Sequence, residues 1–85
     1  MKQSSDHTYT LTLTVRNSPG VLVRCAQIFN RRGHNIEALH VTANPSSQVS
    51  SFMTITAFGK PGISHQITKQ LEKLIDVLDV TENKK

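Results

Sequence analysis

The chain has 85 residues, of which 36% are hydrophobic and 19% are charged, and its formal net charge at pH 7 is +4. This length allows one domain with a thin core, which often depends on a partner subunit, and the composition excludes the disordered and fibrous classes. No apolar run approaches the roughly 20 residues of a membrane helix, and the polar start lacks the apolar stretch of a signal peptide, so we expect a cytoplasmic protein without a membrane anchor.

The first expected element is a strand at residues 8–15, because apolar and polar residues alternate there without a break. Threonine alternates with larger apolar side chains along this segment. Threonine favours strands and stays polar, so the pattern indicates a sheet that is covered on one face and open on the other. The expected core face carries Tyr9, Leu11, Leu13 and Val15.

A helix at about residues 19–32 follows the break after this strand. Gly33 is placed as its C-terminal cap, because glycine tolerates the left-handed backbone of that position. Cys25 is the single cysteine and falls on the apolar stripe, so we expect a buried thiol and no disulfide. The stripe is predicted from Leu22, Cys25 and Phe29 at positions i, i+3 and i+7, flanked by Val21, Ala26 and Ile28.

Two further strands at residues 35–42 and 49–58 are joined by a turn-forming segment and indicate a hairpin, with Met53, Ile55 and Ala57 on the core face of the second strand. A second helix is indicated by one apolar stripe, and a short strand at residues 75–80 follows it. We expect a single domain at residues 8–81, with flexible tails at residues 1–7 and 82–85. The stripe of the second helix is formed by Ile63, Ile67, Leu71 and Leu74.

This order of elements predicts an α+β fold of the ferredoxin-like βαββαβ type, with a four-stranded antiparallel sheet and both helices on one face. The strand at residues 36–42 would then lie at an edge of the sheet. It contains neither lysine nor proline to discourage pairing with another chain. We therefore expect a homodimer that forms through this edge strand.

The sequence offers no arrangement typical of catalysis, so we predict no catalytic residue and no enzymatic activity of this chain. Enzymes of group transfer and hydrolysis need a nucleophile beside a base, or two facing carboxylates, and neither pattern is present. The four histidines are far apart and form no i, i+4 pair, so we predict no metal site. A role at a subunit interface remains open for His34 and His40.

The segment Asn17-Ser18-Pro19-Gly20-Val21-Leu22, where the first strand meets the first helix, is the best candidate for binding. A helix start presents N–H groups and partial positive charge, which suit a carboxylate. Gly20 allows a ligand to approach the backbone, Pro19 fixes the turn, and the Asn17 amide can bond a carboxylate or an ammonium group. The structural alternative is that Asn17 or Ser18 caps the helix while Gly20 eases the turn.

This segment, together with Phe29-Asn30-Arg31-Arg32-Gly33-His34-Asn35-Ile36-Glu37 and Leu74-Ile75-Asp76-Val77-Leu78-Asp79-Val80, resembles the ACT domain of the small regulatory subunit of acetohydroxyacid synthase (acetolactate synthase). The similarity runs from about residue 8 to residue 80 and keeps the motifs in order. Because the chain stops a few residues past the last expected strand, it is similar to the short, single-domain form of that subunit.

The resemblance implies a non-catalytic subunit that activates the catalytic large subunit and confers feedback inhibition by valine in branched-chain amino-acid biosynthesis. Thiamine diphosphate, Mg and FAD would belong to the catalytic partner, and this chain would hold no cofactor. An amino-acid effector would lie between two domains of a homodimer. The implied effector-binding residues are Asn17, Pro19, Gly20, Val21 and Leu22 from one domain, and Asn35 and Ile36 from its neighbour.

Two other classes of function are compatible with the same topology. The first is a stand-alone ACT module that senses an amino acid and regulates a different enzyme. The second is RNA binding, which would place stacking aromatic residues on the open face of the sheet. The first strand presents threonine on that face, and Phe52 and Phe58 are six residues apart, so we expect no nucleic-acid partner.

Overall fold

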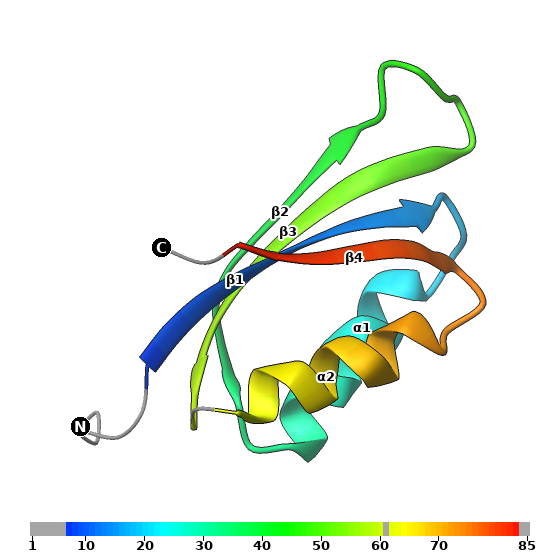
Figure 1. The fold of residues 1–85 in the computed structure, drawn as a ribbon. Helices are drawn as coiled ribbons and strands as arrows, with labels where there is room; N and C mark the ends of the chain where they lie inside the picture. The colour runs from blue at the N-terminus through cyan, green and yellow to red at the C-terminus, as the bar shows by residue number, and fades with distance from the viewer. Residues whose placement is uncertain (1–6, 61, 84–85) are drawn as a thin grey trace.

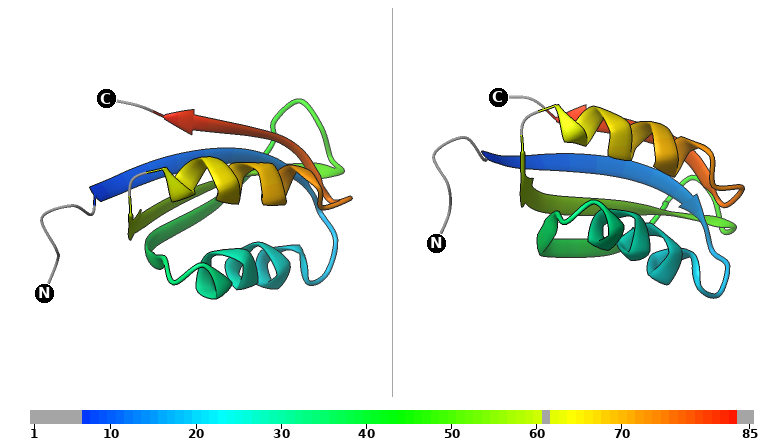
Figure 2. Two further views of the ribbon diagram at one scale, coloured as in Figure 1. Left: turned by 60° about the horizontal axis from the view of Figure 1, so that its bottom comes forward. Right: turned by 90° about the horizontal axis from the view of Figure 1, so that it is seen from below.

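The computed structural model describes residues 7–60 and 62–83, and it confirms the ferredoxin-like βαββαβ fold (Figure 1). The strands form one antiparallel sheet in the order β2-β3-β1-β4, so β2 lies at an edge as expected. Both helices cover the same face of this sheet, α1 on the side of β2 and α2 on the side of β4 (Figure 2). The elements are β1 (His7–Arg16), α1 (Val21–Arg31), β2 (Asn35–Ala43), β3 (Ser50–Gly59), α2 (Ile63–Glu72) and β4 (Val77–Asn83).

The core lies between the sheet and the two helices, and the central strands β1 and β3 supply most of it. Their alternate side chains point to the helices, as the alternation of the sequence predicts. Full burial of each large apolar side chain stabilises the fold by roughly 1.5–3 kcal/mol. The buried residues of these two strands are Tyr9, Leu11, Leu13, Val15, Met53, Ile55 and Ala57.

The apolar stripe of α1 differs by one residue from the expected one. Its buried residues are Val21, Cys25, Ile28 and Phe29, whereas Leu22 is 40% exposed, so the placement of Leu22 in the core was wrong. The helix begins at Val21, and the spacing i, i+4, i+7 and i+8 from there turns Leu22 away from the sheet. The Cys25 thiol is buried as expected, and burial raises its pKa to about 11.

The ends of the sheet extend further than expected. β1 begins at His7 and β4 continues through Glu82 to Asn83, so the assignment of these three residues to flexible tails was wrong. Asn83 pairs with Thr10 across the sheet, and its Nδ2 donates a hydrogen bond to Thr12 Oγ1 at 3.0 Å. The rest of the expected tails, residues 1–6 and 84–85, lies outside the described residues.

The end of α1 leads into a buried polar contact. The C-cap of the helix is Arg32, one residue before the expected position, and Gly33 follows it with the left-handed φ of +72° and an N–H that donates to Asn30 O at 3.1 Å. His34 is then buried in the fold, with Nδ1 2.6 Å from the Tyr9 hydroxyl. The interface role considered for His34 is therefore not supported, while His40 is exposed on β2.

Within the described ranges, neither helix is long and apolar enough to cross a membrane.

Candidate functional site

The bend between β1 and α1 is formed by two short-range hydrogen bonds and one left-handed glycine. The Ser18 N–H donates to Arg16 O at 2.9 Å, and the Val21 N–H donates to Ser18 O at 3.3 Å. Gly20 has φ +84° and is the N-cap of α1, without a side-chain cap. Glycine adopts this conformation at little cost, whereas other residues are strained in it. Because Gly20 occupies the N-cap, the alternative in which Asn17 or Ser18 caps the helix was wrong.

The start of α1 leaves backbone donors at the bend. The first hydrogen bond of the helical pattern runs from the Arg24 N–H to Gly20 O at 3.0 Å. The N–H groups of Leu22 and Val23 lie in the turn before it, where a helix offers no acceptor of its own. Both residues are exposed, and the positive end of the helix dipole adds to the attraction for an anion.

Asn17 holds the bend against the beginning of β3. Its backbone N–H donates to Val49 O at 2.9 Å, and its Nδ2 donates to Gln48 O and Ser50 O at 3.2 and 3.4 Å. The Ser51 hydroxyl donates to Asn17 Oδ1. Both hydrogens of the amide are thus used within the chain, while Oδ1 keeps a second lone pair as an acceptor.

An ion pair ties the other side of the bend to the connection between α2 and β4. The Arg24 guanidinium binds the Asp76 carboxylate, and Asp76 O accepts the Arg16 N–H at 2.8 Å. The Ser18 hydroxyl, and then Arg24, lower the pKa of the Asp76 carboxyl. The guanidinium also lies against Gly20, because a Cβ at that glycine would be 3.1 Å from Arg24 Nη1. The sequence did not indicate this pair, since its members are 52 residues apart.

The structure brings together only part of the predicted site. Pro19 and Leu22 are exposed beside Gly20, whereas the side chain of Val21 is buried in the core and is less accessible to a ligand. Asn35 and Ile36 are at the start of β2, where Asn35 pairs with Phe58 and Phe58 with Thr8. The bend follows the other end of β1, eight residues and about 26 Å away. Within one chain, the bend and the Asn35–Ile36 part of the predicted site are therefore not close together.

The edge strand β2 is exposed over most of its length. Only Ile36 and Leu39 are partly buried, and Val41 is 50% exposed although it lies on the helix side of the sheet, opposite Met53. The register shifts once, between Ile36 and Ala38, and is regular from there to the end of the strand. Such an edge presents backbone donors and acceptors to a second strand.

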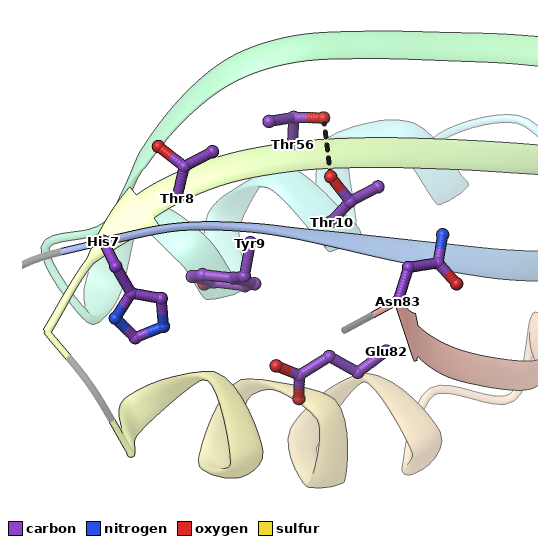
Figure 3. Close-up of a pocket in the computed structure, with 7 residues that line it drawn as sticks. All are labelled: His7, Thr8, Tyr9, Thr10, Thr56, Glu82 and Asn83. Carbon is purple, nitrogen blue, oxygen red and sulfur yellow. Dashed lines mark hydrogen bonds between the residues drawn. The ribbon is translucent and has the colours of Figure 1, made fainter. Parts of the chain in front are cut away.

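A hollow at the beginning of β1, away from the bend, was not expected from the sequence (Figure 3). Thr10 and Thr56 form a hydrogen bond of 3.1 Å between their hydroxyls, and the Tyr9 hydroxyl points into the core toward His34. Burial, and then the Glu82 carboxylate, raise the pKa of Tyr9, so this phenol stays protonated. The lining residues are His7, Thr8, Tyr9, Thr10, Thr56, Glu82 and Asn83.

Among residues 7–60 and 62–83, no three histidine, cysteine or acidic residues are gathered closely enough to hold a metal ion. On the open face of the sheet, Phe52 is opposite Thr14 and Phe58 is opposite Thr8, so the two rings are at different ends of β3. This separation does not provide the adjacent stacking platforms that RNA-binding sheets use.

Comparison with known proteins gives relatives over nearly the whole chain. The acetolactate synthase small subunit of Mycobacterium avium is 46% identical over 78 residues, which are 92% of this chain and 46% of that protein. The probable acetolactate synthase small subunit of Archaeoglobus fulgidus is 43% identical over 74 residues, which are 87% of this chain and 46% of that protein. The chain thus spans less than half the length of these relatives.

Solved structures agree with these relatives. The acetolactate synthase small subunit from Thermotoga maritima has a TM-score of 0.78 and 33% identity, over 89% of this chain and 47% of that chain. The ACT domain from the GTP pyrophosphokinase of Chlorobium tepidum has a TM-score of 0.74 at 12% identity, over 95% of this chain and 90% of that chain, and shares the fold alone. A family model, the AHAS small subunit-like ACT domain, matches residues 11–79. The chain therefore belongs to the family of AHAS small subunit-like ACT domains.

Proposed function

We propose that this chain is a non-catalytic regulatory subunit of acetohydroxyacid synthase, which binds valine and adjusts the activity of a separate catalytic subunit. The observation that carries the proposal is the bend before α1, where Gly20 at φ +84° opens the helix start in a chain of this family. The N–H groups of Leu22 and Val23 would hold the effector carboxylate. The names of the relatives, acetolactate synthase small subunit, support the kind of partner.

The remaining contacts of the effector follow from the same bend. The free lone pair of Asn17 Oδ1 would accept a hydrogen bond from the ammonium group, while Pro19 and Gly20 keep the backbone accessible. The exposed side chain of Leu22 would contact the branched side chain, and Val21 would support it from the core. This division explains why a small branched zwitterion suits the bend.

A second copy of the chain would complete the site. If two β2 strands pair antiparallel about a two-fold axis, the Asn35 end of one strand lies beside the Ala43 end of the other. Ala43 pairs with Ser51, and Ser51 is hydrogen-bonded to Asn17. Asn35 and Ile36 of the second copy would thus approach the bend of the first. We propose this homodimer as the form that binds the effector.

The proposal assigns the chemistry to the partner. Thiamine diphosphate, Mg and FAD would be bound by the catalytic large subunit, and this chain would act in the cytoplasm without a cofactor of its own. Regulation requires that valine bind two states of the complex with different affinity. An effector placed between two copies has this property, because any change in their relative position alters its contacts.

Thermal unfolding with valine tests the effector site. Saturation at about 100 times the dissociation constant would add about 2.7 kcal/mol to the free energy of unfolding and raise the Tm. Gly20→Asp should abolish this shift, because its carboxylate would repel that of the ligand and its side chain would be strained at φ +84°. Gly62→Asp is the matched control, since Gly62 is the left-handed N-cap of α2 and has open space around it.

Two results would contradict the effector site. The first is the absence of a shift with millimolar valine, leucine or isoleucine. The second is a normal valine response of Gly20→Asp.

Sedimentation tests the homodimer. Val41→Lys should weaken dimerisation, because it places a charge on the exposed edge strand. Leu78→Lys is the control on the opposite edge, where Leu78 is 49% exposed on β4. Equal effects of the two substitutions on the dimer would rule out pairing through β2.

Co-expression with the catalytic subunit distinguishes this proposal from a stand-alone sensor. The proposal predicts that the two chains copurify and that valine lowers the activity of the complex. A valine-dependent Tm shift without any association or change in activity would instead favour an ACT module that regulates a different enzyme.

A further inference from the structure

The helix layer of the domain carries an unbalanced set of charges. One acidic residue, Glu72, lies on the two helices and the residues that end them. The other acidic residues of the described ranges lie on strands or in the connection from α2 to β4. Positive charge is thus concentrated on one face of the molecule. The basic residues of the helix layer are Arg24, Arg31, Arg32, Lys69 and Lys73.

Three of these basic residues line a groove between α1 and α2, with a volume of about 390 Å³. Its lining includes the apolar side chains of Ile28 and Leu74, and no carboxylate. Arg24 is paired with Asp76, so the net positive charge of the groove comes from Arg31 and Lys73, which are both exposed. The other lining residues are Gln27 and Gln70.

The placement of the charges indicates the kind of partner. The two basic residues that supply this net charge come from different helices, Arg31 from α1 and Lys73 from the residue that ends α2. A polypeptide segment that lies in the groove can bring a carboxylate to each of them, and its apolar side chains would contact the partly buried Leu74.

We propose that the α1–α2 groove binds an acidic segment of the catalytic partner. This inference rests on the regulatory function proposed above. α1 lies on the side of β2 and α2 on the side of β4, so the groove between them is on the side of α1 that is turned away from the β2 edge (Figure 2). A dimer formed through β2 would leave the groove accessible, and both effector and partner would be bound together.

The test is the affinity of the full chain for the catalytic subunit. The double variant Arg31→Glu/Lys73→Glu should weaken association by about 10-fold or more and reduce its dependence on salt. Arg32→Glu/Lys69→Glu is the matched control, with the same change in charge outside the groove, and should alter the affinity by less than about twofold. Both variants should keep the valine-dependent Tm shift. This measurement is the control that they fold and bind the effector.

The outcomes separate this inference from the proposed function. If the unmodified chain does not associate with the catalytic subunit, the proposed function fails and this inference fails with it. If it associates and the groove variant binds equally well, or no more weakly than the control, only the groove assignment is wrong. Binding of a single-stranded oligonucleotide that the groove variant loses, with unchanged binding of the catalytic subunit, would also overturn it.

Discussion

Substitution of Gly59 by alanine should destabilise the domain through a clash with one buried ring. Gly59 is buried at the end of β3, and a Cβ there would overlap the His34 imidazole. The Tyr9 hydroxyl lies 2.6 Å from Nδ1 of that ring. The ring therefore cannot move away from the new methyl group without weakening a buried hydrogen bond.

The two costs can be estimated separately. Insertion of a methyl group into a packed core costs about 1–3 kcal/mol. A buried hydroxyl that loses its partner costs about 1–3 kcal/mol more. Because small shifts relieve part of the clash, we expect a total of about 2–4 kcal/mol, a large fraction of the 5–15 kcal/mol that is typical of small domains. For a chain of this size the Tm should fall by roughly 10–30 °C.

Urea unfolding of a double-mutant cycle tests the cause. On a His34→Ala background the ring is absent, so Gly59→Ala should cost less than about 0.5 kcal/mol. Gly33→Ala is the control for backbone strain alone, because Gly33 has φ +72° and nothing within 4 Å of its Cβ position. An equal cost of Gly59→Ala with and without the His34 ring would refute the reasoning.

Three substitutions and one labelling reaction test the packing and the charges. Asp76→Asn should flatten the acid limb of stability: the pKa of Asp76 is lowered from 3.8, so its stabilisation is present above that value and is lost as the pH falls through the lower folded pKa. Urea unfolding from about pH 2 to pH 6 measures this, and an unchanged acid limb would contradict it. The Cys25 thiol, with a pKa of about 11, should react with a disulfide reagent at neutral pH only as fast as the domain opens, and immediate labelling would show that it is accessible. Leu13→Ala should cost about 2–5 kcal/mol, because Leu13 is fully buried in the middle of β1. Thr54→Ala on the open face should cost less than about 1 kcal/mol in the same unfolding assay, and similar losses at both sites would contradict the layered fold.

The central strands could be predicted because the alternation of apolar and polar residues indicates a strand and also shows which side chains face the core. The apolar pattern of α1 did not show which of its residues face the sheet. Val21 and Leu22 are adjacent apolar residues that both fit a helical stripe, and only Val21 is buried. Glu82 and Asn83 show a second limit. They are polar residues on an edge strand, and their pairing with β1 depends on contacts that the local pattern does not contain.

The bend of the candidate site could be predicted because Pro19 and Gly20 stand where the period of the sequence changes from two to 3.6. The role of Asn17 could not, because its acceptors are backbone carbonyls of Gln48 and Ser50, more than 30 residues away. His34 illustrates the same point. Its burial depends on a tyrosine 25 residues earlier in the chain and on the missing side chain of Gly59.

The separation of the two halves of the site has a thermodynamic consequence. Within one chain, the bend and the Asn35 end of β2 lie at opposite ends of the sheet, so a monomer offers an effector only part of its contacts. If the dimer supplies the rest, the effector binds the dimer more tightly and must also stabilise it, because the coupling between the two equilibria is reciprocal. Substitutions on the edge strand would then weaken effector binding without touching the ligand, and an effector that left dimerisation unchanged would require that one bend alone hold it.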